Sequence, residues 1–295
     1  MDVVFDILLD TTFDTLKLLP FLFLTYLAME TLEHKAGEKA KEAIGKAGKA
    51  GPAIGALLGV FPQCGFSAAA TTLYAGRVIT LGTLFAVFLS TSDEMLPIFI
   101  AEQVDVAIIL KILGVKVLIG MVMGFLVDAA LRLARRKELQ TQESDGHQIH
   151  RLCEQDKCDC HEGKGGILKG AIKHTLQVTL FIFLVSLFLN TVISLLGEDV
   201  LTSFMLNNPE LSVFVSALVG LIPNCAASVV IAQLYIEGAL GAGAMMAGLL
   251  VSAGVGFLVL FRTNRRLREN IAIMAGLYGI GVLWGLLFSA IGITF

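Results

Sequence analysis

The sequence has 295 residues, of which 56% are hydrophobic and only 16% are charged, and its formal net charge is −3. A soluble domain is typically about 45–50% apolar and about 25% charged, so this composition argues against a soluble enzyme. Several runs of about 20 apolar residues instead predict an all-α polytopic membrane protein, with the lipid bilayer and a small solute as partners and no nucleic acid.

In the first half of the chain, polar links separate four apolar segments. These segments are expected at about 13–32, 52–76, 78–100 and 106–131. The second of them is interrupted by Pro62-Gln63-Cys64-Gly65, where a helix-breaking proline stands beside polar side chains. In lipid, such interruptions are tolerated only where they line a cavity or are buried in protein. A long polar loop, 132–172, follows the first half.

The second half, residues 173–295, repeats this plan. Its apolar segments are expected at about 174–196, 212–236, 239–261 and 270–293. The interruption recurs as Pro223-Asn224-Cys225-Ala226 at a constant offset, since 225 − 64 = 161 and, for the tyrosines that follow, 235 − 74 = 161. Paired interruptions in two halves of a membrane protein point to a transport site. We therefore assign residues 1–131 and 173–295 to two transmembrane repeats.

The distribution of charge predicts how the repeats cross the membrane. Eighteen of the 22 Lys and Arg residues lie in the links 34–51, 132–173 and 262–268, which the positive-inside rule places in the cytoplasm. This topology requires the segments 52–76 and 212–236 to be re-entrant helical hairpins. Each repeat then has three transmembrane helices and one re-entrant hairpin, the repeats are inverted, and both termini lie outside. A model in which both broken segments span fully stays open, although it violates the charge rule.

The hairpin turns would meet near the middle of the membrane, where they could bind an ion. They offer side-chain oxygen and sulfur atoms and free backbone carbonyls, which are usual contacts in transporters of this plan. The candidate residues are Gln63, Cys64, Ser67, Asn224, Cys225 and Ser228. The alternative is that the turns only pack helices, since Gly, Ala and Ser permit close approach.

Three ionisable residues within the predicted spans are further candidates. Asp93 and Glu94 would lie below the outer edge of the membrane, where a carboxylate marks an ion or proton path. Lys116 lies near the middle of the next span and could act as a counter-ion or in charge coupling. If the span 78–100 instead ended at Leu89, the two acids would simply be exterior.

The central loop carries ligands that suit soft metals. They are His147, His150, Cys153, Cys158, Cys160 and His161. Thiolates and imidazoles bind Zn²⁺ and similar ions, but the spacing matches no zinc-finger pattern and the polar surroundings are typical of disorder. A metal-binding loop and an inert linker both stay open.

At these motifs the sequence resembles a family of bacterial ten-helix heavy-metal exporters, also described as manganese transporters or arsenic efflux proteins. The resemblance covers nearly the whole chain, and it is carried by Val60–Ser67, Leu89–Pro97, the Cys/His loop, His174–Leu176 and Ile222–Ser228. A more distant similarity links the family to ArsP-type organoarsenical permeases. In those permeases several cysteines lie together at the hairpin, whereas this chain has one cysteine in each predicted hairpin. This difference argues against the binding of arsenic by thiol groups. The resemblance implies export of a metal ion from the cytoplasm.

We therefore expect a secondary transporter, not an enzyme, that exports a divalent cation with Mn²⁺ as the first candidate. Proton antiport is the expected energy source, and no cofactor is expected besides the transported ion. The expected location is the bacterial cytoplasmic membrane, with the central loop inside the cell. Two other hypotheses stay open: a permease for an organoarsenical or another small anionic or metalloid solute, and a metal sensor centred on the loop 147–161.

Overall fold

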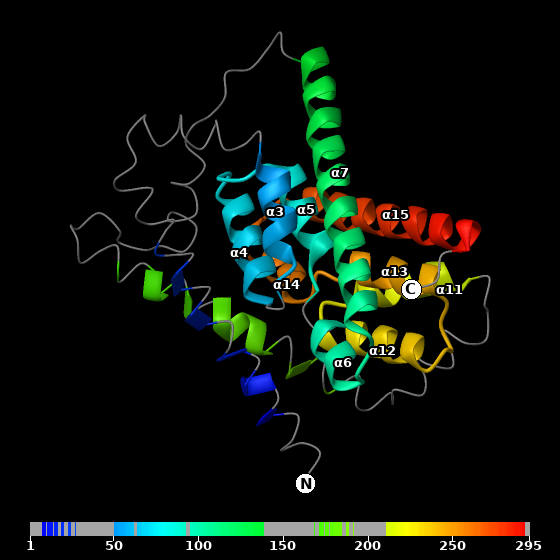
Figure 1. The fold of residues 1–295 in the computed structure, drawn as a ribbon. Helices are drawn as coiled ribbons and strands as arrows, with labels where there is room; N and C mark the ends of the chain where they lie inside the picture. Colours follow the sequence, from blue (N-terminus) through cyan, green and yellow to red (C-terminus); the bar gives the residue numbers. More distant parts are fainter. Residues whose placement is uncertain are drawn as a thin grey trace.

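The computed structural model describes residues 50–61, 64–92, 95–138 and 211–292, together with parts of the segments 8–27 and 168–191 (Figure 1). Every element of regular secondary structure in these ranges is a helix, which confirms the predicted all-α class. Three of the candidate site residues, Gln63, Asp93 and Glu94, and the whole Cys/His loop lie outside the described residues.

The helices of the two halves have closely corresponding bounds. The first half contributes α3 Gly51–Gly59, α4 Cys64–Ala75, α5 Leu81–Ser90, α6 Met95–Ala101 and α7 Val106–Glu138. The second half contributes α11 Ser212–Gly220, α12 Cys225–Ile236, α13 Ala242–Val251, α14 Val255–Thr263 and α15 Leu267–Ile291. The first residues of α3, α4 and α5 recur at the offset found in the sequence, because 212 − 51, 225 − 64 and 242 − 81 all equal 161.

The two segments predicted as spans at 78–100 and 239–261 are each divided into two helices. The first break separates α5 from α6, and the hydroxyls of Ser90 and Thr91 there donate back to carbonyls of α5, at 2.8 and 2.7 Å. Such local hydrogen bonds compete with propagation of the helix. The second break separates α13 from α14, and Gly254 adopts a φ of 49° there, a conformation that glycine reaches without steric cost.

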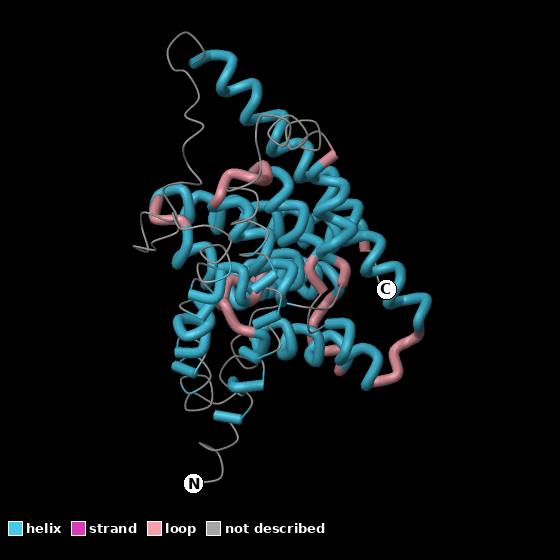
Figure 2. Tube along the Cα trace, turned by 90° about the vertical axis from the view of Figure 1, so that its left-hand side faces the viewer, coloured by secondary structure: helices cyan, strands magenta, loops and turns pink. Residues whose placement is uncertain are grey.

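Packing joins the helices within each half and also between the halves. α5 packs against both α3 and α7, and α13 packs against both α11 and α15. Between the halves, α4 packs against α14 and α12 packs against α6 (Figure 1). In the view turned by 90°, the described part of the chain consists of helices joined by loops (Figure 2). All ten residues of α13 are buried, which places this helix at the centre of the core.

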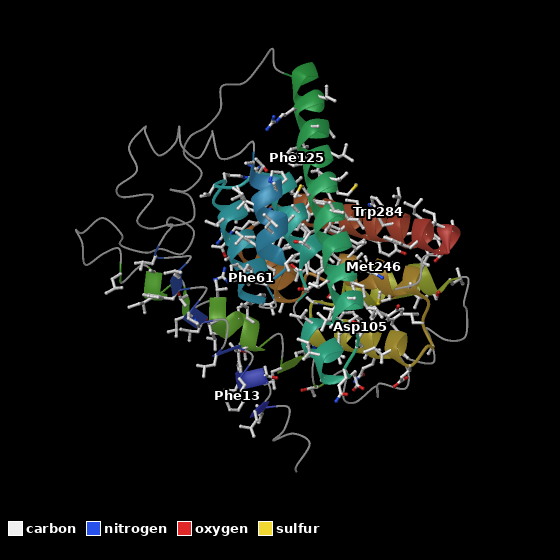
Figure 3. The ribbon with its side chains drawn as sticks, viewed as in Figure 1. Phe13, Phe61, Asp105, Phe125, Met246 and Trp284 are labelled. Atoms are coloured by element: carbon white, nitrogen blue, oxygen red, sulfur yellow. The ribbon has the colours of Figure 1, made fainter. Side chains whose placement is uncertain are left out.

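Three helical segments are long and apolar enough to cross a membrane: Val106–Leu133, Ala242–Thr263 and Leu267–Ile291. The first agrees closely with the predicted span 106–131. The middle one comprises α13 and α14, and its most apolar stretch is 94% buried, against 28% and 33% for the other two. The outward faces of α7 and α15 are therefore apolar and exposed, as at Phe125 of α7 (Figure 3), and this surface suits contact with lipid.

Candidate functional site

A buried lysine lies between the first helix break and α13. Lys116, on α7, is only 1% exposed. Its ammonium group donates to the carbonyl oxygen of Thr91, the residue that ends α5, and to that of Leu249 in the last turn of α13, the latter at 2.9 Å. Carbonyls in the last turn of a helix lack intrahelical partners and carry the negative end of the helix dipole. One carbonyl from each half therefore stabilises the same positive charge.

The first helix break is also joined to the end of α3, where the predicted hairpin turn begins. The hydroxyl of Ser92 donates to the carbonyl oxygen of Val60, the residue that ends α3, at 2.6 Å. Ser90, Thr91 and Ser92 are all buried. The turn after α3, the break after α5 and the ammonium of Lys116 thus form one connected polar region inside an apolar bundle. Asp93 and Glu94 follow Ser92 directly in the sequence.

The predicted hairpin serines are buried on two different helices, Ser67 on α4 and Ser228 on α12. Near Ser67, the hydroxyl of Thr71 donates to the carbonyl of Ser67 at 2.8 Å and to that of Gly256 in α14 at 3.2 Å. This second bond ties the first hairpin to the helix that follows the second break.

The remaining predicted residues of the hairpins lie at the turns. Asn224 is half-buried in the turn before α12, and its backbone N–H donates to the carbonyl of Ile222 at 2.7 Å. Cys64 and Cys225 are the first residues of α4 and α12, but the positions of their side chains lie outside the description. Among the residues that the structure describes, no group of three or more His, Cys, Asp or Glu side chains could hold a metal ion.

A second polar cluster, which no sequence pattern had indicated, joins the end of the first hairpin to α15. Arg77 donates to both carboxylate oxygens of Glu269, at 3.0 and 3.1 Å, and the hydroxyl of Tyr74 donates to the same carboxylate. The guanidinium of Arg77 also lies over the Tyr74 ring, 5.1 Å from its centre. Burial alone would lower the pKa of Arg77, but its hydrogen bonds to Glu269 and the charge of that residue outweigh burial and raise it. Because 192 residues separate the ion pair, no local spacing could have revealed it.

Asp128 is another buried carboxylate that the sequence reasoning missed. One of its oxygens accepts the backbone N–H of Gly82 at 2.8 Å, and the other accepts the hydroxyl of Thr80 at 2.7 Å. Thr80 in turn caps the start of α5, so the carboxylate stabilises the positive end of that helix. The sequence did contain an indication of it. Asp128 is an ionisable residue within the predicted span 106–131, and Lys116 was selected as a candidate because it is one too.

Residues 2–165, more than half of the chain, match the model of the family described as "Putative, 10TM heavy-metal exporter". The chain belongs to this family. It is therefore a membrane protein of a heavy-metal exporter family and not an enzyme. Comparison with curated proteins and with solved structures finds no match.

The family match covers the part of the site that the first half supplies. It includes the hairpin turn after α3, the break after α5, and Lys116. The resemblance inferred from the sequence motifs is thereby confirmed. Helices α11–α15, which supply Leu249 and the second hairpin, lie beyond the matched residues.

Proposed function

We propose that this protein exports a divalent metal cation from the bacterial cytoplasm as a secondary transporter, with Mn²⁺ as the first candidate. The observation that carries the proposal is the convergence of the Thr91 and Leu249 carbonyls on the buried ammonium of Lys116. Broken helices whose C-terminal carbonyls face a positive charge are the means by which transporters of this plan hold cations. Both halves of the chain contribute a carbonyl group here. A transporter that opens alternately to the two sides of the membrane needs such a site between its halves.

The transported ion would be bound by side chains at the hairpin turns and directly after Ser92. These ligands are Gln63, Cys64, Ser67, Asp93, Glu94, Asn224, Cys225 and Ser228. Carboxylate, amide and hydroxyl oxygens suit Mn²⁺. Lys116 would couple the movement of the metal to that of a proton. The loop ligands between His147 and His161 would then deliver or sense the metal rather than form its path.

The proposed architecture is an inverted repeat, with α3–α4 and α11–α12 as re-entrant hairpins. Three observations support it: the equal lengths and constant offset of α3 and α11, α4 and α12, and α5 and α13; a helix break in each half; and the reciprocal packing of α4 on α14 and α12 on α6. The basic links then place the loop 132–172 in the cytoplasm and both termini outside.

A second candidate function is transport of a small anionic or metalloid solute such as an organoarsenical. The same lysine favours it, because a buried positive charge beside half-helices can also attract an anion. The two candidates make opposite predictions for the carboxylates. A cation site needs Asp93 and Glu94, whereas an anion site would bind more weakly because of them.

Binding of Mn²⁺ to the purified full chain, followed by electron paramagnetic resonance of the free ion, tests the proposal. We expect Glu94→Gln to weaken binding at least tenfold, about 1.4 kcal/mol, because it removes a ligand charge. Glu102→Gln is the matched control, since Glu102 is an exposed acid eight residues further on, and it should leave binding unchanged. Equal Mn²⁺ binding by wild type and Glu94→Gln would refute the assigned site, and absence of Mn²⁺ binding by the wild type would favour the anion permease.

A further inference from the structure

The two hairpins differ in the side chains that α4 and α12 carry at corresponding positions. In the second hairpin, Val230 and Ile231 of α12 are buried, with 5% and 0% of their surface exposed. At the corresponding places in α4, 161 residues earlier, the chain has Ala69 and Ala70. Ala69 and Ala70 both line a gap between α3 and α4, where side chains of the size of valine and isoleucine would occupy part of the space.

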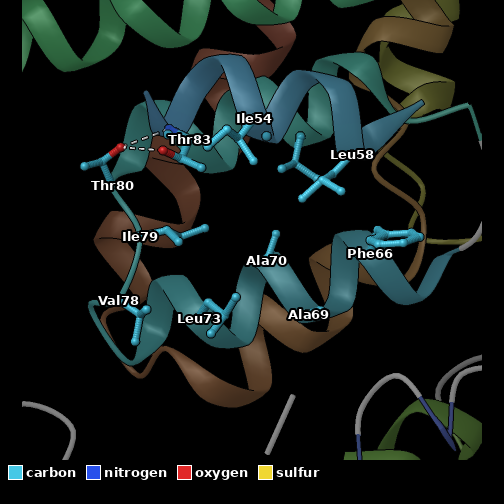
Figure 4. Close-up of a pocket in the computed structure, with 13 residues that line it drawn as sticks. Ile54, Leu58, Phe66, Ala69, Ala70, Leu73, Val78, Ile79, Thr80 and Thr83 are labelled. Carbon is cyan, nitrogen blue, oxygen red and sulfur yellow. Dashed lines mark hydrogen bonds between the residues drawn. The ribbon is translucent and has the colours of Figure 1, made fainter. Parts of the chain in front are cut away.

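This gap is a cavity of about 410 Å³ (Figure 4). Ile54 and Leu58 line it from α3, and Phe66, Ala70 and Leu73 line it from α4. Cavities that hold a small molecule are about 300–1,000 Å³, so the space is adequate for a ligand. It is too large to be an ordinary packing defect, because protein interiors contain few voids larger than a water molecule.

The chemistry of the lining restricts the occupant. The lining is apolar except at one end, where Thr80 and Thr83 lie. Their hydroxyls bond to each other at 2.8 Å, and that of Thr80 also bonds to Asp128. A wall of hydrocarbon cannot compensate an ion or a polar solute for its lost hydration. The cavity is therefore unsuited to the metal cargo, and its ligand must be apolar.

The position of the cavity indicates the source of that ligand. Ile54 and Leu58 belong both to the lining and to the outer surface, where they are 51% and 42% exposed. The neighbouring side chains Leu57 and Phe61 are exposed as well. The cavity is thus continuous with an apolar surface of a membrane protein, where phospholipid chains are the abundant apolar molecules.

We propose that the cavity between α3 and α4 binds one acyl chain of a membrane phospholipid. The bound chain fills the space beside Ala69 and Ala70 and supports the arrangement of α3 and α4 around it. This site is distinct from the region around Lys116.

Fluorescence quenching by phospholipids with brominated acyl chains tests this inference on the full chain. The chain has one tryptophan, so Trp284→Phe gives a silent background. Phe66→Trp then reports on the cavity, and Phe125→Trp on α7 reports on the ordinary lipid-facing surface. Brominated lipid should quench both reporters. The pair Ala69→Val and Ala70→Ile, which imports the residues of the second hairpin, should abolish quenching at position 66 and leave it unchanged at position 125.

Two outcomes would overturn the inference. Absence of quenching at position 66 in the unfilled protein would mean that another part of this chain or a second copy covers the cavity. Quenching that persists after filling would mean that the reporter touches surface lipid only. A second measurement avoids the filling substitutions, because a variant that fails to fold would also lose quenching. Mass spectrometry of the delipidated, unsubstituted protein should find a retained phospholipid. Because neither assay measures transport, both can fail or succeed independently of the proposed function.

Discussion

Lys116 shows how a single side chain can connect two halves of a membrane protein. An ammonium group buried among apolar helices is costly unless polar atoms replace its hydration. Here the carbonyls of Thr91 and Leu249 do so, and both are available because each stands in the last turn, or just beyond the end, of a short helix. The cost of burying the lysine and the cost of breaking the helices thus offset each other in part.

The ion pair of Arg77 and Glu269 should contribute less to stability than its bidentate geometry suggests. The two side chains are 33% and 24% exposed, and ion pairs that water reaches contribute about 0.2–1 kcal/mol. We therefore expect a double-mutant cycle of Arg77→Ala and Glu269→Gln to give a coupling below about 1 kcal/mol in thermal unfolding.

The same pair should have a larger effect on conformation, because it ties the end of α4 to α15. Spin labels on these two helices should show a broader distance distribution in Arg77→Ala than in the wild type. An unchanged distribution would show that the pair does not hold the hairpin in place. Arg77→Lys is the informative partner variant, since it keeps the charge and loses the bidentate bond.

At the scale of helices, glycines decide how closely α11 and α13 approach. A Cβ atom added at Gly220 would collide with the backbone carbonyl of Gly248, whereas one added at Gly114, on the exposed side of α7, would meet nothing within 4 Å. These two positions offer a matched pair of identical substitutions.

Gly220→Ala should destabilise the protein by about 1–3 kcal/mol, because backbone atoms cannot move aside easily. Gly114→Ala should instead stabilise it by up to about 1 kcal/mol, through the better helix propensity of alanine. Thermal unfolding of both variants in the same detergent is the measurement. Equal shifts of the two unfolding temperatures would refute the close packing of α11 on α13.

The sequence predicted the positions of the helices more accurately than the breaks within them. The interruptions at Pro62 and Pro223 were evident because a proline stood in an apolar run. The break at residues 91–94 was less evident, since Ser and Thr occur within helices as well as at their ends. The break before Val255 comprises Ser252, Ala253 and a glycine with positive φ, Gly254, and small residues do not specify such a conformation by themselves.

At the scale of the whole molecule, the constant offset of 161 residues predicted which helices correspond. It could not predict which of them pack together, because contacts such as that between Arg77 and Glu269 join residues 192 positions apart. Lys116 could likewise be selected from the sequence as a buried charge. That its ammonium group donates to the carbonyl of Leu249 could not be predicted, because the two residues lie far apart in the sequence. The residues of the candidate site could thus be selected from the sequence. The hydrogen bonds that join them to other helices could be found only in the structure.

At the scale of the whole molecule, α5 and α13 share their length and the arrangement of their neighbours, since α5 packs against α3, α4 and α7 as α13 packs against α11, α12 and α15. α13 lies at the centre of the bundle, between α11 and α15 and in contact with α5 and α12. Under the proposed function, a metal bound beside its last turn would lie between the two halves, which could expose it to one side of the membrane at a time. This arrangement suits a transporter better than a sensor, in which a buried metal path has no purpose.

Under the proposed function, the chain moves a divalent cation through the region next to Lys116. The most direct test is a flux panel of Mn²⁺, Zn²⁺, Fe²⁺, Co²⁺ and Ca²⁺ in proteoliposomes with an imposed pH gradient. We predict Mn²⁺ flux driven by the gradient, reduced at least tenfold by Asp93→Asn and by Lys116→Met. Asp105→Asn, which alters an exposed acid at the start of α7, should leave it unchanged. If no divalent ion moves under either direction of the gradient, the cation assignment is wrong, and the anion permease replaces it.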